Sequence, residues 1–333
     1  MFRDDVVPTA RILGTGSYAP ERVLGNAELE GRLSTTAGWI EQHTGIERRR
    51  VAAEGEATSD LAVKASRRAI AAAGLSVADL DLIVTATSTP DSPLPACAAH
   101  VQNKLGADLI PSFDLNASSA GFLYALTLAE QFITVGTCNT VLVVGAEIMS
   151  RVIDPLDRNS AALFGDAAGA VVLGPAGDDG RGILSSKLQA DGTFADMMQV
   201  PAGGVAEPLS AESIEARRHL LDFRASELRD ITVKHLTSYS MQALKAARLT
   251  SAELDWVVPQ QGHMGIVRTI SERLGYPLDK FILNMQEYGN TGAASIPLAL
   301  DEGVRDGRIE PGHTVLTCAL GAGITWGAMM VRM

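Results

Sequence analysis

The chain has 333 residues, of which 46% are hydrophobic and 20% are charged, a composition typical of a globular protein with a large core. Its formal net charge of −11 argues against general nucleic-acid binding, which requires a basic surface. No uncharged apolar run approaches the roughly 18 residues of a membrane span, and the acidic N-terminus is unlike a signal peptide, so we expect a cytoplasmic protein. The three cysteines lack the spacing of a disulfide framework or metal site, and we expect no metal and no cofactor.

The predicted elements alternate between Ala-rich helices and short strands of Val, Ile and Leu. In chain order they are a helix at Ala62–Ala73, a strand at Leu82–Thr85, a helix at Ala120–Thr134, and strands at Val141–Val144 and Ala170–Leu173. Such strands suit a sheet that is buried on both faces. Acidic and Gly-rich loops interrupt the pattern between residues 151 and 225, which predicts a loop-rich excursion that shapes a tunnel or a lid.

An internal repeat runs through the chain at a constant offset. Residues 71–87 align with 245–261, so that Leu75 pairs with Leu249 and Val84 with Val258, each 174 residues further on. The same offset aligns Asn116 with Asn290. One offset across separate elements predicts a duplicated α/β unit. We therefore expect a five-layered α-β-α-β-α fold with pseudo-equivalent halves at residues 1–176 and 177–333.

A candidate nucleophile lies in residues 114–124, Asp-Leu-Asn-Ala-Ser-Ser-Ala-Gly-Phe-Leu-Tyr, which predict a short strand leading into a helix. Unpaired backbone N–H groups at a helix start stabilise negative charge, so a serine there is well placed to attack a carbonyl. Serine is also a frequent helix cap, and this segment alone leaves that alternative open. The duplication predicts that Ser119 faces the loops at 259–263, 289–292 and 321–323, where Gln260, His263 and Asn290 lie.

Four motifs resemble the β-ketoacyl-ACP synthase III group of the thiolase superfamily. They are Trp39-Ile-Glu-Gln-His-Thr-Gly-Ile-Glu-Arg-Arg49, Phe164-Gly-Asp-Ala-Ala-Gly-Ala170, Tyr288-Gly-Asn-Thr-Gly-Ala-Ala-Ser-Ile-Pro297 and Gly321-Ala-Gly-Ile-Thr-Trp-Gly327. The resemblance implies a thiolase-like fold, a homodimer, and an enzyme that moves an acyl group from a thioester to a cysteine. That acyl group is then condensed with malonyl-ACP, and a histidine and an asparagine stabilise the enolate.

Two of the three catalytic positions that the resemblance implies have changed type. The nucleophile position falls on Ser119 instead of cysteine and the histidine position on Gln260, whereas Asn290 is retained. The backbone N–H groups of Ser119 and Ala322 fall at the oxyanion positions. A serine hydroxyl normally needs a base, and Gln260 can only donate or accept hydrogen bonds. If residues 259–263 open a helix, His263 shares a face with Gln260 and is either the base or a partly exposed bystander.

The resemblance also implies residues that bind the thioester carrier and the acyl chain. Trp39 matches a tryptophan that stacks on the adenine of CoA, His43 replaces an arginine, and Arg158 matches an arginine of the CoA pocket. Arg224 lies in a segment that aligns poorly with the family near the pantetheine arm, which suggests altered carrier recognition. Leu94 matches a residue that reaches across the dimer into the neighbouring acyl pocket.

Three functions remain open from the sequence. The first is an acyltransferase or starter-unit ketosynthase of polyketide or related biosynthesis, which loads Ser119 from acyl-CoA or acyl-ACP. The second is a non-catalytic thioester-binding protein, or a heteromeric partner of an active ketosynthase. The third is an engineered cysteine replacement that traps a complex, although Gln260 argues against it because one substitution would suffice. Retention of Asn290 favours a working enzyme, and the loss of an acid or base at position 260 favours transfer over decarboxylative condensation.

Overall fold

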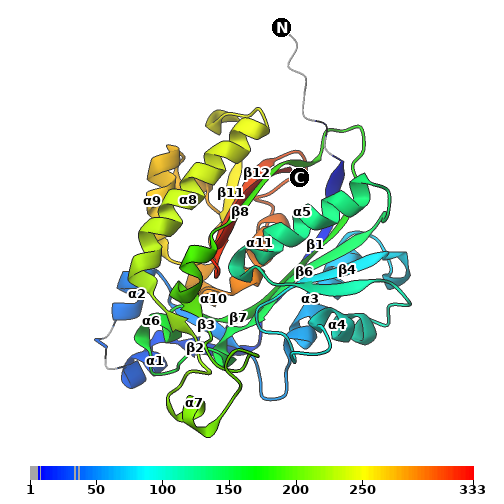
Figure 1. Cartoon of the computed structure of the whole chain (residues 1–333). Helices are drawn as coiled ribbons and strands as arrows, with labels where there is room; N and C mark the ends of the chain where they lie inside the picture. Colours follow the sequence, from blue (N-terminus) through cyan, green and yellow to red (C-terminus); the bar gives the residue numbers. More distant parts are fainter. Residues whose placement is uncertain (1–6, 8, 34, 37) are drawn as a thin grey trace.

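The computed structural model describes residues 7, 9–33, 35–36 and 38–333, and it contains two large β-sheets (Figure 1). The first sheet has the strand order β1-β7-β6-β4-β5, in which β4 is parallel to β5 and β6, and β7 is antiparallel to β6 and β1. Its half of the chain contains β1 (Ala10–Tyr18), α3 (Thr58–Ala72), η1 (Val77–Asp79), β4 (Leu82–Ala86), α4 (Cys97–Leu105), β5 (Ser112–Leu115), η2 (Ser118–Ala120), α5 (Gly121–Thr134), β6 (Val141–Ile148), η3 (Met149–Arg151) and β7 (Asp166–Pro175).

The second sheet repeats this topology in the order β11-β12-β13-β8. An isolated parallel bridge between Val257 and Phe281 takes the place of the β4–β5 pairing. This half contains β8 (Gly182–Ala190), α8 (Ala225–Ala246), η5 (Ser251–Glu253), β11 (Trp256–Pro259), α9 (Met264–Leu274), η6 (Leu278–Lys280), η7 (Gly292–Ala294), α11 (Ser295–Arg305), β12 (Thr314–Gly321) and β13 (Thr325–Arg332).

The predicted repeat is visible in the element starts. Four pairs begin 174 residues apart: η1 and η5, β4 and β11, η2 and η7, and α5 and α11. The predicted boundary at residues 176 and 177 falls in the connection between β7 and β8. Each half therefore builds one sheet and contributes one helix to the space between the two sheets.

Five layers result, which confirms the predicted α-β-α-β-α arrangement (Figure 1). Helices α3 and α4 cover the outer face of the first sheet, α8 and α9 cover the second, and α5 and α11 lie between the sheets and contact both. Helix α5 is apolar on several sides, with Phe122, Leu123 and Leu126 all buried, because both of its faces meet a sheet. Each such side chain contributes about 1.5–3 kcal/mol through burial.

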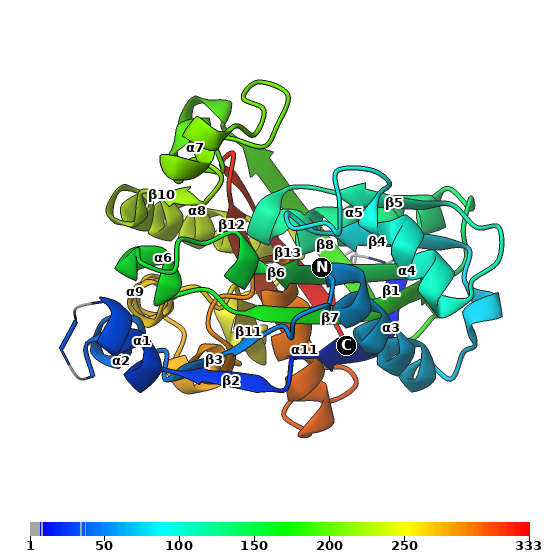
Figure 2. The same cartoon turned by 90° about the horizontal axis from the view of Figure 1, so that it is seen from below.

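The remaining segments form two additions to this core (Figure 2). Near the N-terminus, β2 (Arg22–Gly25), α1 (Asn26–Leu33), α2 (Trp39–Thr44) and β3 (Arg48–Val51) lie beside α9. The other addition runs from η4 (Gly192–Met197) through β9 (Met198–Gln199) and α7 (Ala211–Glu215) to β10 (Asp222–Phe223). The short helices α6 (Arg158–Ala161) and α10 (Met285–Tyr288) complete the described elements.

The expected excursion over residues 151–225 is shorter than predicted, because β7, β8 and η4 lie inside that range as ordered elements. The longest loop-rich part is residues 200–221, which holds only the short helix α7, and β9 and β10 close its base by pairing antiparallel. None of the helices in the described part of the chain is both long and apolar enough to cross a membrane.

Candidate active site

Ser119 lies in a tight turn between β5 and α5, as the sequence predicts. The backbone N–H of Ser118 donates to Oδ1 of Asn116 at 3.2 Å, and Ser118 adopts a left-handed conformation with φ of 48°. Ser119 follows in η2 and is only 3% exposed. Gly321 of β12 lies so close that a Cβ on it would be 2.7 Å from the backbone nitrogen of Ser119. The turn is therefore held from both halves of the chain.

The second half carries the same turn at the equivalent position. The backbone N–H of Gly292 donates to Oδ1 of Asn290 at 3.0 Å, and Gly292 has a φ of 57°. The two turns pack against each other through η2 and η7. Asn290 thus lies at the start of α11 as Asn116 lies at the start of α5, which confirms their predicted equivalence.

Ser119 lines a cavity of about 250 Å³ that we call the serine cavity. Ala322 and Gly292 also line it, so two of the three loops predicted to face Ser119 do so. Val200 and Leu221 from the excursion form part of its wall, in agreement with the predicted tunnel-shaping role.

Gln260, His263 and Asn290 line a second cavity of about 240 Å³, the glutamine cavity. Phe164 and Met198 line both cavities, so the two adjoin along these side chains. The loop at 259–263 therefore lines the cavity next to that of Ser119, and that its side chains face Ser119 stays a prediction. The three polar side chains are therefore together, and Ser119 lies in the next cavity.

Both carboxamides in the glutamine cavity have their oxygens fixed by backbone donors. The N–H of Leu320 donates to Oε1 of Gln260 at 3.0 Å, and Oδ1 of Asn290 accepts from Gly292. An N–H group can pair only with the amide oxygen, so these contacts settle the orientation of each amide. The two NH₂ groups are the parts left to bind a ligand, and Nδ2 of Asn290 faces Gly262. The cavity therefore offers hydrogen-bond donors to a carbonyl or enolate oxygen.

His263 is the N-cap of α9, which corrects the expectation that residues 259–263 open a helix. Its backbone is extended, with φ of −163°, and the N–H of Gly265 donates to Nδ1 at 3.0 Å. Burial, with Arg229 and His43, lowers the pKa of His263, which favours the neutral ring. Because Nδ1 accepts that bond, the proton of the neutral ring is on Nε2 and no lone pair is free. This geometry favours the alternative in which His263 is a bystander over the one in which it is the base.

Glu147 on β6 is a residue of the serine cavity that the sequence analysis missed. It is 1% exposed, and burial raises the pKa of its carboxyl to about 7. Thr89 Oγ1 donates to it at 2.6 Å and the N–H of Ser88 at 3.0 Å. The only hint in the sequence is an acid within the apolar run 141–148, where a strand buried on both faces is predicted.

Three of the four predicted carrier-binding residues form one cluster. The rings of Trp39 and His43 stack with centroids 4.3 Å apart, and the Arg158 guanidinium lies 5.2 Å from the Trp39 ring centroid. Helix α2 packs against α9, and His43 is close enough to lower the pKa of His263, so the cluster lies next to the glutamine cavity. Arg224 instead forms an ion pair with Asp196 at 3.1 Å.

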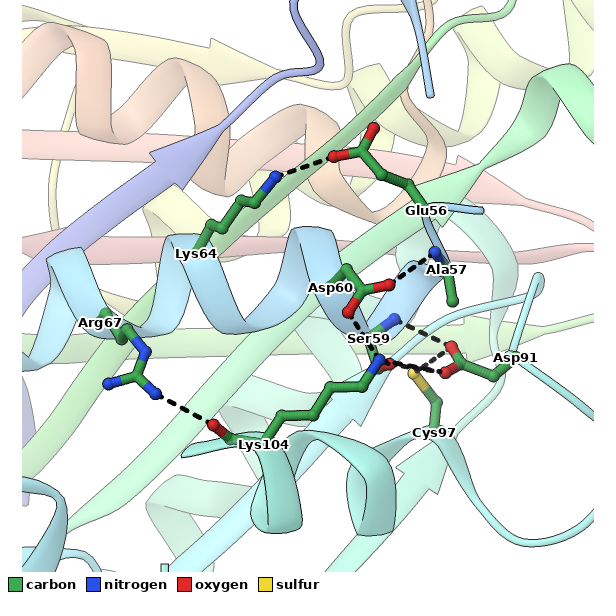
Figure 3. Close-up of polar contacts among 9 residues, drawn as sticks. All are labelled: Glu56, Ala57, Ser59, Asp60, Lys64, Arg67, Asp91, Cys97 and Lys104. Atoms are coloured by element: carbon green, nitrogen blue, oxygen red, sulfur yellow. Dashed lines mark hydrogen bonds and ion pairs between the residues drawn. The ribbon is translucent and has the colours of Figure 1, made fainter. Parts of the chain in front are cut away.

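Leu94 is 86% exposed and lies in the loop between β4 and α4. Asp91 anchors this loop by accepting hydrogen bonds from the backbone N–H and hydroxyl of Ser59 at 2.9 and 2.5 Å (Figure 3). Nζ of Lys104 lies 2.6 Å from Oγ of Ser59 and from Oδ1 of Asp60. These contacts tie the base of the loop to α3 and α4, so Leu94 projects from a fixed support.

No cysteine can replace Ser119 as nucleophile. Cys97, Cys138 and Cys318 are free and buried, and none lines either cavity. Burial raises the pKa of all three thiols, which keeps them protonated and unreactive.

Two family models match the chain. Residues 113–192 match 3-oxoacyl-[acyl-carrier-protein] synthase III and residues 244–333 match its C-terminal part. The β-ketoacyl-[acyl-carrier-protein] synthase III of Clostridioides difficile strain 630 is 43% identical over 323 residues, which cover 97% of this chain and 98% of the relative. The chain belongs to the β-ketoacyl-[acyl-carrier-protein] synthase III family.

Solved structures of this family agree with the fold. The synthase III of Aquifex aeolicus VF5 superposes with a TM-score of 0.90 at 36% identity and covers 97% of this chain and 100% of its own. The priming β-ketosynthase of the R1128 polyketide biosynthetic pathway gives 0.89 at 34% identity, with 99% and 98% covered. The synthase III family is one of acyltransferase-type enzymes with a thiolase fold, as the sequence motifs indicated.

Proposed function

We propose that this synthase III family member takes an acyl group from acyl-CoA or acyl-ACP onto Ser119 and passes it to an acceptor. The observation that carries this proposal is the position of Ser119, buried at the start of α5 on a cavity that adjoins a second one lined by donors. A serine that only capped the helix would not need to line a cavity that adjoins a second cavity with hydrogen-bond donors. The N-cap residues of η2 and α5 are Ala117 and Ala120, so the hydroxyl of Ser119 does not cap either helix.

The chemistry follows from the donors around the turn. Backbone N–H groups of Ser119 and Ala322 are proposed to bind the oxyanion that forms when the hydroxyl attacks the thioester carbonyl. The NH₂ groups of Gln260 and Asn290 would bind an oxygen of the incoming or accepting group in the glutamine cavity. Two neutral donors stabilise an enolate less well than a charged group, so transfer to an alcohol, amine or thiol acceptor is favoured over fast decarboxylative condensation.

The carrier would enter at the glutamine cavity, where Trp39 and His43 offer a stacked aromatic surface and Arg158 offers a cation beside it. An adenine ring and its phosphates suit such a surface. A starter-unit role in polyketide or related biosynthesis is supported by the similarity to the R1128 priming β-ketosynthase.

We also propose that the protein is a homodimer formed through the β5 edge. In the described part of the chain, no strand pairs with the outer side of β5. Leu94 and Leu109 are 86% and 102% exposed nearby in sequence, and an open edge with exposed apolar residues favours association. A second copy would cover this edge and receive Leu94 in its acyl pocket. Light scattering should give the mass of two chains; a monomer at micromolar concentration would contradict the dimer.

The proposed function is tested by intact-protein mass spectrometry after incubation with a panel of acyl-CoA and acyl-ACP thioesters. We expect one acyl adduct on the wild-type protein and none on Ser119→Ala, and the mass of the adduct identifies the acyl group. An adduct of equal yield on the Ser119→Ala protein would show that another residue is acylated. No adduct from any thioester would instead support a non-catalytic thioester-binding or partner role.

A further inference from the structure

The serine cavity contains one ionisable side chain among its described lining residues, the carboxyl group of Glu147. A serine that attacks a thioester must lose its proton to some group. Gln260 has no basic atom, and the lone pair on Nδ1 of His263 accepts a hydrogen bond from the N–H of Gly265. The group that accepts the proton therefore has to be sought within the serine cavity itself.

Glu147 lies where the two equivalent turns meet. A Cβ on Gly292 would be 2.8 Å from Cγ of Glu147, and the backbone N–H of Ala293 donates to its carboxylate. Turn η7, which contains both residues, packs against η2, which contains Ser119. The carboxyl group is thus placed at the start of α11 and lines the same cavity as Ser119.

A polar path also connects Glu147 to the nucleophile turn. Its carboxylate accepts from the N–H of Ser88, and the Ser88 hydroxyl lies 3.5 Å from Oδ1 of Asn116. The same oxygen of Asn116 accepts from the N–H of Ser118, next to Ser119. This path links the segment that holds the Glu147 carboxylate to the turn that presents Ser119.

The neighbours of Glu147 make it a base and not an ion-pair partner. They are the Thr87, Thr89 and Ser88 hydroxyls and the backbone N–H groups of Ser88 and Ala293, all neutral donors. Among the described residues no cation contacts this carboxylate, and burial raises its pKa to about 7. A carboxylate in this range is present in substantial fraction at neutral pH and is far more basic than an exposed one.

We propose that Glu147 is the general base for Ser119, an inference that rests on the proposed acylation of that serine. Oγ of Ser119 forms a bond to the thioester carbonyl carbon, and its proton passes within the cavity, directly or through one water molecule, to the Glu147 carboxylate. The carbon–sulfur bond then breaks. The leaving thiolate takes the proton from Glu147 and departs as a thiol, which leaves an acyl-serine ester and a regenerated carboxylate.

The test compares Glu147→Gln in two nucleophile backgrounds, the wild-type protein and Ser119→Cys. The acylation rate is followed by quenched mass spectrometry with the acyl-CoA that labels Ser119 best. A thiol ionises readily without a base, so a base is needed only by serine. We expect Glu147→Gln to slow acylation of Ser119 by about 100-fold or more and that of the cysteine by less than about fivefold.

Glu130 on α5 provides a matched control. Burial raises the pKa of its carboxyl to about 7 as well, but it lines neither cavity and contacts Thr9. Glu130→Gln makes the same chemical change as Glu147→Gln, but on α5, the helix that follows the nucleophile turn. It should leave acylation unchanged. Circular dichroism establishes that each variant is folded. If Glu147→Gln does not fold, Glu147→Asp in both backgrounds gives the same comparison.

The outcomes separate this inference from the proposed function. A loss confined to the serine background supports Glu147 as base. An equal loss with serine and cysteine overturns it and assigns Glu147 to holding the Ser88 loop, and normal acylation by Glu147→Gln overturns it as well. If the wild-type protein forms no adduct while Ser119→Cys does, the proposed function fails, and the inference fails with it.

Discussion

Glu147 should make the stability of the protein depend on pH in a way that a glutamine at this position abolishes. Its carboxyl has a pKa of about 7 in the folded protein against an ordinary value of 4.5. Between these values the folded state holds the proton more tightly than the unfolded chain, so the stability of the wild-type protein falls as the pH rises through this window. At about 1.4 kcal/mol per unit of pKa, the full effect is about 3 kcal/mol.

Urea denaturation of the wild-type protein and of Glu147→Gln at pH 5 and pH 8 measures this contribution. Other titrating groups are common to both proteins and cancel in the difference. We expect the free energy of unfolding of Glu147→Gln, relative to the wild type, to rise by about 2.5 kcal/mol from pH 5 to pH 8. A difference that does not change with pH would refute the reasoning, because it would mean that the donors around Glu147 keep its pKa near 4.5 and that burial does not prevail.

Five further substitutions, at four positions, test the geometry of the turns and caps. Gly321→Ala, whose Cβ would lie 2.7 Å from the backbone nitrogen of Ser119, should destabilise the protein by about 1–3 kcal/mol in thermal unfolding and slow acylation. Ser118→Gly should relieve a left-handed backbone and raise the free energy of unfolding by up to about 1 kcal/mol, with a decrease showing that the serine side chain matters more. His263→Ala should cost about 1 kcal/mol and His263→Asn almost nothing, because asparagine also caps a helix. Gln260→Ala should slow acylation more than His263→Ala, and the reverse order in a rate assay would return the histidine to the chemistry.

The fold was predictable because its signals are local and repeated. Apolar runs such as 82–85 and 141–144 fix buried strands, and the offset of 174 residues pairs them across the halves. The turn at Ser119 was predictable for a similar reason, since a strand, an asparagine and an Ala-rich helix follow one another within about fifteen residues of sequence.

The parts that could not be predicted depend on contacts between distant segments. The assignment of Ser119 and Gln260 to two adjoining cavities involves Phe164 and Met198, which line both and which no spacing rule connects to either residue. That His263 caps α9 through Nδ1 depends on an extended backbone, not on helical spacing. Glu147 was missed because the sequence of a strand does not show which residues or cavity an acidic side chain within it contacts.

The paired turns described above also determine where negative charge resides during the proposed attack. Ala293, which occupies in the second half the position that Ser119 occupies in the first, donates its backbone N–H to the Glu147 carboxylate at the start of α11. When the proton moves from Ser119 to Glu147, the charge leaves that helix start and appears on the oxyanion at the start of α5. The total charge of the enclosed space stays constant throughout the attack. Each helix end is already oriented to hold that charge, so little reorganisation of the surroundings is needed as it crosses from one half of the protein to the other.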